Sequence, residues 1–400
     1  MIELEQAIAL VTGALSPQID SELVPLAQAS GRVTACALKA PLAVPNFVRS
    51  AMDGYAVYAT DVVRASPEQP RRLTVLGTIY AGDHMSYTPR MGTAVRVMTG
   101  AAIPPGYDAV VKQELTDQGQ AVVQIYQPIK AGKNLMPIGE DIISGQVVFE
   151  PYTYLNGDSV GILASLGYTT VPVLQRLRVG LIATGNELVI PGQPLAPNQI
   201  YNSTIYSLAA YIERTGGQVV LQTICQDNPA ELMALLTQNK QKADLFITTG
   251  GISVGAKDFI PATLTANGGQ PLFHFVNLRP GTPIFAANWQ HKLILSLSGN
   301  PFAAMVNFHL FYWPLLVRFQ RNEHFNLKKQ TARLVAGKMP ATSMRRFVRA
   351  KLTGTEVVID KKGHYASVLH NMIDNNCLIE QIKGKSLQVG DQVTVYSWPD

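Results

Sequence analysis

The spacing of apolar and polar residues divides the chain into segments with different expected structures. Leu4, Ile8, Val11 and Leu15 recur at helical intervals, so the chain is expected to open with a short amphipathic helix. From about residue 41 to residue 137, short β-prone runs alternate with Gly, Pro and Asp turns and show no helical period. This pattern is typical of a compact all-β module.

Between residues 176 and 325, buried-type strands alternate with helices. The apolar runs at 179–183, 219–224, 245–248 and 293–297 have the continuous hydrophobic character of strands that are covered on both faces. Residues 205–212 follow a helical period, and Asn228-Pro229-Ala230-Glu231 supplies a capping side chain, a first-turn proline and an early glutamate. The alternation predicts a doubly wound, mainly parallel sheet with helices on both faces.

After about residue 326 the chain returns to short strands and turns, which predicts a small C-terminal β-barrel or sandwich. The expected architecture is therefore an α/β multidomain chain. Its expected parts are an N-terminal helical and linker domain (1–40 plus 138–175), a β-rich insert domain (41–137), an α/β domain (176–325) and a C-terminal β-barrel domain (326–400).

Composition and cysteine usage narrow the class of protein. With 400 residues and 47% hydrophobic residues, the chain can bury several cores, which excludes general disorder. The most apolar stretch, 308–317, is half of the ~20 residues that a membrane span needs. Cys36, Cys225 and Cys377 are far apart in the sequence, which argues against a cysteine-based metal site and for a reducing compartment. With an acidic rather than basic start, the chain is expected to be cytoplasmic.

Positive charge is concentrated at one end of the chain. Residues 321–400 contain 13 Lys and Arg against 7 Asp and Glu, whereas the preceding residues are close to neutral. An ordinary solvated face explains such an excess, and so does an anionic partner. No dense basic run with interleaved aromatic residues is present, so nucleic acid is not an expected partner.

Three apolar strands of the α/β segment run into turns that contain glycine. Glycine lets backbone N–H groups approach a ligand closely, and a helix N-terminus adds partial positive charge. Turns at the carboxyl ends of parallel strands gather at one edge of the sheet, so an anion-binding site is expected there. The residues are Thr184, Gly185 and Asn186; Thr249, Gly250, Gly251, Ser253 and Gly255; and Ser298, Gly299, Asn300 and Pro301.

Acidic residues accompany these turns. Asp53, Asp141, Glu187, Asp227 and Asp258 each occur at a turn or a strand end rather than on a charged helical face. A turn or capping role is the simpler interpretation of each one alone. Beside an anion site, however, such carboxylates suit Mg²⁺, which takes one or two of them together with phosphate oxygens and waters.

A competing motif lies in the second turn. Gly251-Ile252-Ser253-Val254-Gly255 matches the Gly-x-Ser-x-Gly pattern of serine hydrolases. That pattern requires a strand that enters the turn directly and a helix that leaves it directly. Two glycines precede Ser253 and Pro261 follows, so a serine hydrolase is a minor alternative.

An ordered series of motifs resembles the molybdopterin molybdenumtransferase family, which includes bacterial MoeA and the gephyrin E domain. The resemblance covers essentially the whole chain. The motifs are Ser50-Ala51-Met52-Asp53-Gly54-Tyr55-Ala56-Val57, Val95 to Ala101, Gly139-Glu140-Asp141-Ile142, Leu163 to Gly167, Thr184 to Leu188, Thr249 to Gly255, Arg279-Pro280-Gly281 and Ser298 to Pro301, followed more loosely by Arg345 to Ala350 and Ser367 to Leu378.

The resemblance implies an enzyme that takes adenylylated molybdopterin and molybdate, uses a divalent cation, and yields molybdenum cofactor and AMP. It implies a homodimer with a shared active site, in which Asp53 and Thr99 come from the partner subunit. Asp141, Glu187, Asp227 and Asp258 fall at the acidic site positions. Candidate contacts to molybdate are Arg279, Ser298, Arg345 and Ser367. Molybdopterin adenylyltransferase and apo-molybdoenzymes are expected partners.

Several positions depart from the family pattern. The family usually has Trp-Lys at His274-Phe275, and Lys at Arg279 and Thr282, so one of three expected cations remains. Each charged hydrogen bond contributes about 1.5–3 kcal/mol, so weakened molybdate affinity is expected. Asn186 replaces an Asp that could bind magnesium. A relative that binds the pterin nucleotide or a partner protein without catalysis therefore stays open as the alternative.

Overall fold

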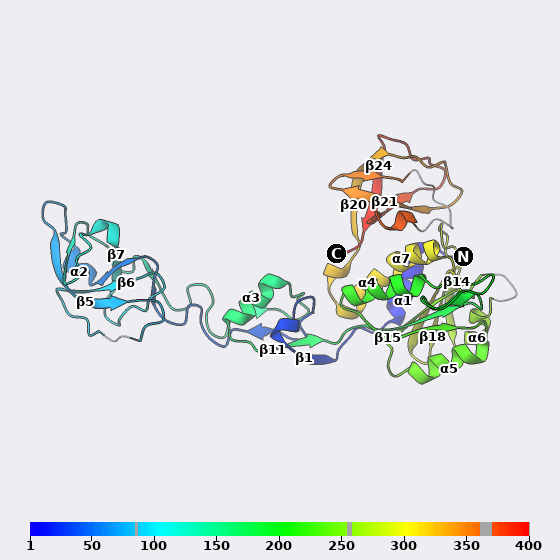
Figure 1. The fold of residues 1–400 in the computed structure, drawn as a ribbon, viewed down its shortest axis with the longest axis horizontal. Helices are drawn as coiled ribbons and strands as arrows, with labels where there is room; N and C mark the ends of the chain where they lie inside the picture. Colours follow the sequence, from blue (N-terminus) through cyan, green and yellow to red (C-terminus); the bar gives the residue numbers. More distant parts are fainter. Residues whose placement is uncertain (85–86, 254–257, 361–369, 400) are drawn as a thin grey trace. The chain divides into compact units, whose positions relative to one another are not determined.

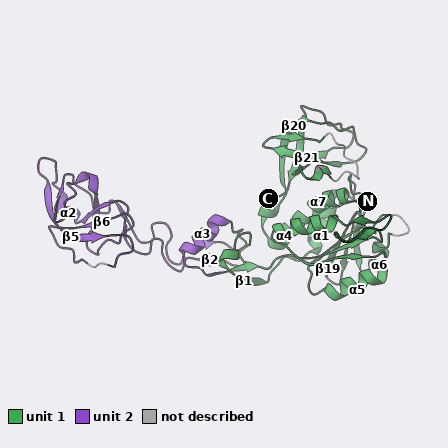
Figure 2. Cartoon of the chain, viewed as in Figure 1, with its two compact units in different colours: residues 1–36, 152–156, 171–400 green, residues 37–151, 157–170 purple. Residues whose placement is uncertain are grey.

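A computed structural model describes residues 1–84, 87–253, 258–360 and 370–399. Contacts divide the chain into two compact units (Figure 2). One contains residues 1–36, 152–156 and 171–400, and the other contains residues 37–151 and 157–170. Each is described by itself, and the residue boundaries of the four expected domains remain a prediction.

A mixed sheet forms the centre of the first unit, in the order β15-β12-β16-β19-β18-β17. Strands β15, β12, β16 and β19 run parallel, as the alternation of apolar strands and helices predicts. Strands β18 and β17 extend the sheet in antiparallel fashion. The bounds are β12 Arg178–Thr184, β15 Gln218–Cys225, β16 Leu245–Thr249, β17 Gln270–His274, β18 Phe285–Trp289 and β19 Lys292–Leu297.

Helices cover both faces of this sheet, so the doubly wound α/β fold is confirmed (Figure 1). Leu181 packs with residues of α1 (Leu4–Ala14), α4 (Thr204–Arg214) and α7 (Pro301–Gln320). The next residue along the strand, Ile182, packs with residues of α5 (Pro229–Asn239) and α6 (Ile260–Ala266). Successive side chains of a strand point to opposite faces, which is why adjacent residues join different cores.

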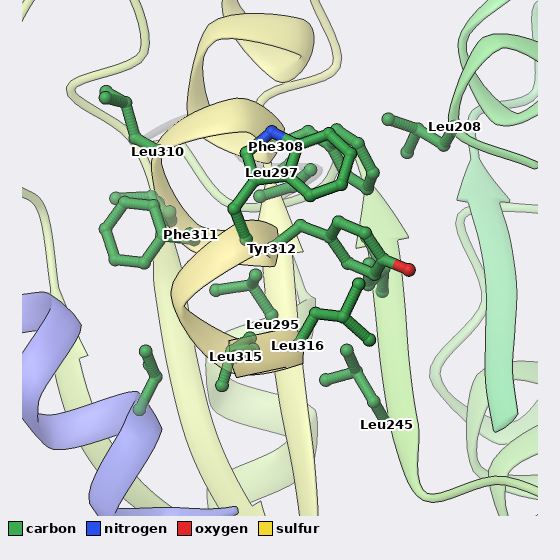
Figure 3. Packing of buried hydrophobic residues seen from close by; sticks show 14 of the residues in the cluster. Leu208, Leu245, Leu295, Leu297, Phe308, Leu310, Phe311, Tyr312, Leu315 and Leu316 are labelled. Atoms are coloured by element: carbon green, nitrogen blue, oxygen red, sulfur yellow. The ribbon is translucent and has the colours of Figure 1, made fainter. Parts of the chain in front are cut away.

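Helix α7 is buried along most of its length, which accounts for its apolar sequence. The rings of Phe308 and Tyr312 are stacked, with their centroids 4.6 Å apart. Figure 3 shows both rings beside Leu295 and Leu297 of β19. His309, on the same helix, stacks on Trp398 at 3.8 Å, and burial lowers its pKa to about 3. It is a packing residue. No helix in the described part of the chain is long and apolar enough to cross a membrane.

The C-terminal residues form the predicted closed barrel, in the order β20-β22-β21-β23-β24. Its interior contains Leu334, Val348, Ile379 and Val395. The bounds are β20 Lys328–Ala336, β21 Arg346–Thr353, β22 Glu356–Val358, β23 Cys377–Gln381 and β24 Gln392–Ser397.

The second unit is built around a sheet in the order β7-β4-β6-β5-β8, as the β-rich pattern predicts. Its strands are β4 Gly54–Val57, β5 Arg71–Ile79, β6 Thr93–Val97, β7 Ala109–Lys112 and β8 Val122–Ile125.

The remaining elements of the two units are short: β1 Ser21–Pro25, β2 Leu38–Lys39, β3 Arg49–Ser50, α2 Ala59–Val62, β9 Leu135–Met136, β10 Val147–Phe149, α3 Gly157–Ser165, β11 Thr170–Leu174, β13 Leu188–Val189, β14 Ile200–Tyr201, and 3-10 turns at Leu26–Gln28, Gln113–Leu115, Glu323–Phe325 and His370–Met372.

Candidate active site

Strand register brings the glycine-containing turns to one edge of the central sheet. Thr184 pairs with Cys225, Ala183 pairs with Thr249, and Thr249 pairs with Leu297. These residues lie at the carboxyl ends of four parallel strands, so the turns that follow them meet at the same edge. Backbone bonds tie the turns together, since Gly250 N–H donates to the Leu297 carbonyl at 3.0 Å.

A cavity of about 360 Å³ lies at this edge. Most of the predicted residues of the three turns line it, which is the arrangement that the sequence predicted for an anion site. Gly255 and Ser367 lie outside the described residues. The lining residues are Thr184, Gly185, Glu187, Leu188, Ile200, Tyr201, Asn202, Ser203, Thr204, Asp227, Thr249, Gly250, Gly251, Ile252, Ser253, Asp258, Pro283, Ser298, Gly299 and Pro301.

Glycine is required where two of these turns touch. Gly250 has a φ of +90°, and a Cβ atom there would lie 2.6 Å from the backbone oxygen of Thr184. A Cβ atom on Gly299 would lie 3.2 Å from the Cα atom of Gly250. Side chains at either position would separate the turns, so the cavity wall depends on glycine.

The N-terminus of α7 adjoins the same cavity. Asn300 caps the helix, since its Oδ1 atom accepts a hydrogen bond from Ala303 N–H at 3.1 Å, and Pro301 occupies the first turn. A twenty-residue helix presents unpaired N–H groups and partial positive charge at this end. The turn and the helix together favour a negatively charged ligand without a lysine.

Carboxylates line the cavity beside these N–H groups. Glu187, Asp227 and Asp258 come from the turns after β12 and β15 and from the segment before α6. The Asn186 side chain connects two of these turns, since its Oδ1 atom accepts from Asp227 N–H at 3.0 Å. Across the described residues, no three His, Cys, Asp or Glu side chains are grouped closely enough to hold a metal ion by themselves.

The second unit contains the other predicted acidic residues. Asp53 Oδ1 accepts hydrogen bonds from the backbone N–H and the hydroxyl of Thr99, each at 2.8 Å. These bonds hold the pKa of Asp53 below its ordinary value. Asp141 also belongs to this unit, in a turn where its N–H donates to the Val44 carbonyl at 3.0 Å. The cavity is formed by residues of the first unit, and Asp141 is not among them.

The two predicted arginines lie in different surroundings. Arg279 is exposed, and its backbone bonds to the barrel strand β21. Arg345 forms ion pairs with Glu5 at 2.6 Å and with Glu380 at 2.7 Å. These carboxylates already neutralise the Arg345 guanidinium, which makes it a poor contact for a free anion.

The positions where the family resemblance led us to expect lysine have contacts within the protein. The Phe275 ring stacks on His274 at 3.8 Å, and His274 Nε2 lies 2.8 Å from the Ile252 carbonyl. The Thr282 hydroxyl donates to the Leu278 carbonyl at 2.6 Å. Both side chains make contacts within the protein, and neither carries a charge to offer a ligand.

The hydrolase pattern lacks its required setting. Strand β16 ends at Thr249, and residues 250–252 separate it from Ser253, so the strand does not enter the serine turn directly. Residues 254–257 of the pattern and its exit lie outside the described residues. Ser253 lines the cavity with the glycine turns instead.

Sequence patterns missed part of the site. The cavity is also lined by Asn202, Ser203 and Thr204 at the start of α4. No recognisable sequence motif marks these three residues. Arg349 of β21 does not line the cavity but is buried near it in the fold, since its guanidinium lies 3.4 Å from the centre of the Phe302 ring in the first turn of α7. Burial lowers the pKa of Arg349 to about 10. The sequence shows a cluster of arginines at 345–349, but only the fold shows which of these arginines contacts α7.

Two family models match the chain. One is described as "MoeA N-terminal region (domain I and II)" and matches residues 2–167. The other is described as "Probable molybdopterin binding domain" and matches residues 180–318, which include the cavity residues.

Whole-chain comparisons agree with these matches. A molybdopterin molybdenumtransferase from Haemophilus influenzae is 33% identical, over 99% of this chain and 98% of that protein. Molybdopterin molybdenumtransferase 2 from Mycobacterium tuberculosis is 40% identical, over 73% of this chain and 74% of that protein. The crystal structure of a molybdopterin biosynthesis MoeA protein from Pyrococcus horikosii superposes with a TM-score of 0.86 at 30% identity, over 99% of both chains. The chain belongs to the molybdopterin molybdenumtransferase family, whose members are enzymes of molybdenum cofactor biosynthesis.

Proposed function

We propose that the chain inserts molybdate into adenylylated molybdopterin and releases AMP and molybdenum cofactor. The observation that carries this proposal is the cavity at the carboxyl edge of the central sheet. Glycine-containing turns, the α7 N-terminus and carboxylates converge there. Backbone N–H groups at such turns and at a helix N-terminus bind anions, so they suit the phosphates of a pterin nucleotide.

In this proposal, the chain acts mainly by positioning and electrostatics. The turns around Gly250 and Gly299 hold the phosphate of the pterin, and the capped α7 terminus adds favourable charge. Arg279 contacts the oxyanion substrate, for which a guanidinium offers paired hydrogen bonds. Phosphoryl cleavage needs charge neutralisation more than covalent assistance from the protein.

The carboxylates fit the binding preference of magnesium. Mg²⁺ commonly binds one or two protein carboxylates and completes its shell with phosphate oxygens and waters, so it does not need a full protein cage. Glu187, Asp227 and Asp258 offer such oxygen ligands on the cavity wall. When bound, the ion would neutralise negative charge on the pyrophosphate.

The proposed assembly is a homodimer in the cytoplasm, in which Asp53 and Thr99 of the partner complete the site. In this proposal, the hydrogen bonds from Thr99 orient the Asp53 carboxylate that the partner would contribute. The substrate chemistry implies a molybdopterin adenylyltransferase as supplier and apo-molybdoenzymes as recipients of the product.

The direct test is AMP release by the purified chain. With adenylylated molybdopterin, molybdate and Mg²⁺, AMP is expected to appear in an amount that matches the molybdenum cofactor formed. Removal of Mg²⁺ with EDTA is expected to stop the release, and added Mg²⁺ to restore it. Absence of AMP across a wide molybdate range would contradict the proposal.

A second candidate function is binding of the pterin nucleotide without turnover. The contacts of Phe275 and Thr282 favour it, because these side chains replace two of the family's lysines with uncharged groups. Nucleotide binding without AMP release, not rescued by Phe275→Lys together with Thr282→Lys, would support this candidate over the enzyme.

A further inference from the structure

A separate, smaller cavity lies in the first unit. Its volume is about 100 Å³, and it shares no lining residue with the candidate active site. Segments that are far apart in the sequence meet around it, among them residues 30–31, the C-terminal end of α4 and Pro399 near the end of the chain. The polar side chains among its lining residues include those of Ser30, Tyr154, Arg176, Glu213, Arg214 and His324.

Internal contacts fix two walls of this cavity before any ligand binds. The Tyr154 ring stacks on His324, with the ring centroids 3.6 Å apart and the planes 16° from parallel. Gly31 N–H donates to the Leu155 carbonyl at 2.8 Å, which ties the turn at residues 30–31 to the same segment. A preformed cavity of this kind loses little conformational entropy when it takes up a ligand.

Positive charge exceeds negative charge among the described lining residues. Arg176 and Arg214 each carry a guanidinium group, whereas Glu213 supplies a carboxylate. In the part of the chain that the structure describes, neither arginine forms an ion pair or a side-chain hydrogen bond. The Arg214 guanidinium lies 5.4 Å from the centre of the Tyr211 ring, and Glu213 Oε1 accepts a hydrogen bond from Val219 N–H at 2.7 Å. The cavity therefore offers two cations that pair with no described carboxylate.

Arg214 is not needed to complete the end of helix α4. A basic residue in the last turn of a helix often bonds to the final carbonyl groups. Here the hydroxyl of Thr215 donates to the Tyr211 carbonyl at 2.8 Å, and Gly217 N–H donates to the Ile212 carbonyl at 2.9 Å. These carbonyls have partners from the cap itself, so the Arg214 guanidinium stays available to a ligand.

Two hydroxyl groups accompany the arginines. Those of Ser30 and Tyr154 have no hydrogen-bond partner within the described residues. Burial raises the pKa of Tyr154, so this hydroxyl stays protonated and can donate a hydrogen bond. Burial also lowers the pKa of His324, with a further contribution from the charge of Lys328, so its stacked ring is neutral at pH 7. The available groups are mainly donors, which is the chemistry that an anion requires.

We propose that this cavity binds a free oxyanion of the phosphate class, with Arg176 and Arg214 as its charge partners. Sites for drug-sized organic ligands have volumes of about 300–1,000 Å³, so about 100 Å³ accommodates the ion but not a nucleotide. A guanidinium group suits such an ion, because its planar fork donates two parallel hydrogen bonds to neighbouring oxygens. The bound ion joins the end of α4 to the segment before β12, so it stabilises the first unit and takes no part in the proposed reaction.

Calorimetric titration of the full chain with sodium phosphate tests this site. Arg176→Ala and Arg214→Ala are each expected to weaken phosphate binding about tenfold to a hundredfold, the range for one lost charged contact. Arg214→Lys keeps the charge without the planar fork and is expected to bind with intermediate affinity. Arg318→Ala is the matched control, because Arg318 is an exposed arginine of α7 that lines neither cavity, and it is expected to bind phosphate like the wild type.

Competition with AMP separates this cavity from the one at the central sheet. AMP is too large for the smaller cavity, so an excess of AMP is expected to leave phosphate binding unchanged. Displacement of the phosphate by AMP would place the ion at the central sheet and overturn the inference.

Thermal unfolding shows whether a variant has lost the site or the fold. Without phosphate, Arg176→Ala is expected to keep the wild-type Tm, because the described residues give Arg176 no ion pair to lose. Phosphate is expected to raise the Tm of the wild type and of Arg318→Ala, but not that of Arg176→Ala. Wild-type phosphate affinity in both Arg176→Ala and Arg214→Ala, an equal loss in Arg318→Ala, or no phosphate binding by the wild type up to millimolar concentrations would each contradict the proposed site.

Discussion

AMP release is expected to fall at least about a hundredfold when Glu187 is replaced by glutamine. Glu187 lies exposed on the cavity wall, where its carboxylate offers oxygen ligands to a divalent cation. Glutamine has the same shape without the negative charge, so the cavity is preserved while cation binding is lost. The measurement is kcat for AMP release with saturating Mg²⁺, together with Tm from thermal unfolding, which is expected to stay unchanged.

Glu356→Gln is the matched control for this variant, because Glu356 is an exposed carboxylate of the barrel strand β22. It is expected to leave kcat at the wild-type value. If the proposed homodimer shares its site, mixing Glu187→Gln chains with Asp53→Asn chains is expected to restore part of the activity. Wild-type kcat in Glu187→Gln would show that this carboxylate has no part in the reaction.

Gly250→Ala is expected to abolish measurable AMP binding and to lower the free energy of unfolding by about 1–3 kcal/mol. The new Cβ atom would lie 2.6 Å from the Thr184 carbonyl oxygen, in a backbone conformation with a φ of +90°. The turns after β12 and β16 must then separate, which moves the N–H groups that form the anion site. Calorimetric titration with AMP and urea unfolding measure the two effects.

Gly268→Ala controls for backbone strain without the steric contact. Gly268 has a φ of +83°, and a Cβ atom there has no neighbour within 4 Å. It follows α6 and is not part of the cavity lining. This variant is expected to lose stability from strain alone and to bind AMP normally. Equal losses of AMP binding in both variants would mean that the contact with Thr184 does not shape the site.

Local sequence patterns were sufficient for the central architecture and for much of the cavity. Continuous apolar runs identify strands buried on both faces, and parallel strands necessarily end at a common edge. The turns after Thr184, Thr249 and Leu297 could therefore be placed together before any coordinates were known. The cap at Asn228 also agrees, since its side chain accepts from Ala230 N–H at 2.9 Å.

Features that depend on contacts between distant residues could not be predicted in this way. Strand β17 contains Pro271, which argues against a strand, yet the sheet edge tolerates a residue that cannot donate a ladder bond. The sequence made Arg345 a candidate anion contact. In the fold it forms an ion pair with Glu5, which lies near the other end of the chain. The pairing of Arg279 with Arg346 likewise follows from the barrel strand packing beside the α/β turn.

The central claim is that the carboxyl edge of the sheet binds the phosphates of adenylylated molybdopterin. A crystal structure of the chain with this nucleotide and Mg²⁺ tests it most directly. The phosphates are expected within hydrogen-bond distance of backbone N–H groups in the turns at Gly250 and Gly299, with the ion beside Glu187. Nucleotide bound elsewhere on the protein, with this cavity filled only by water, would contradict the claim.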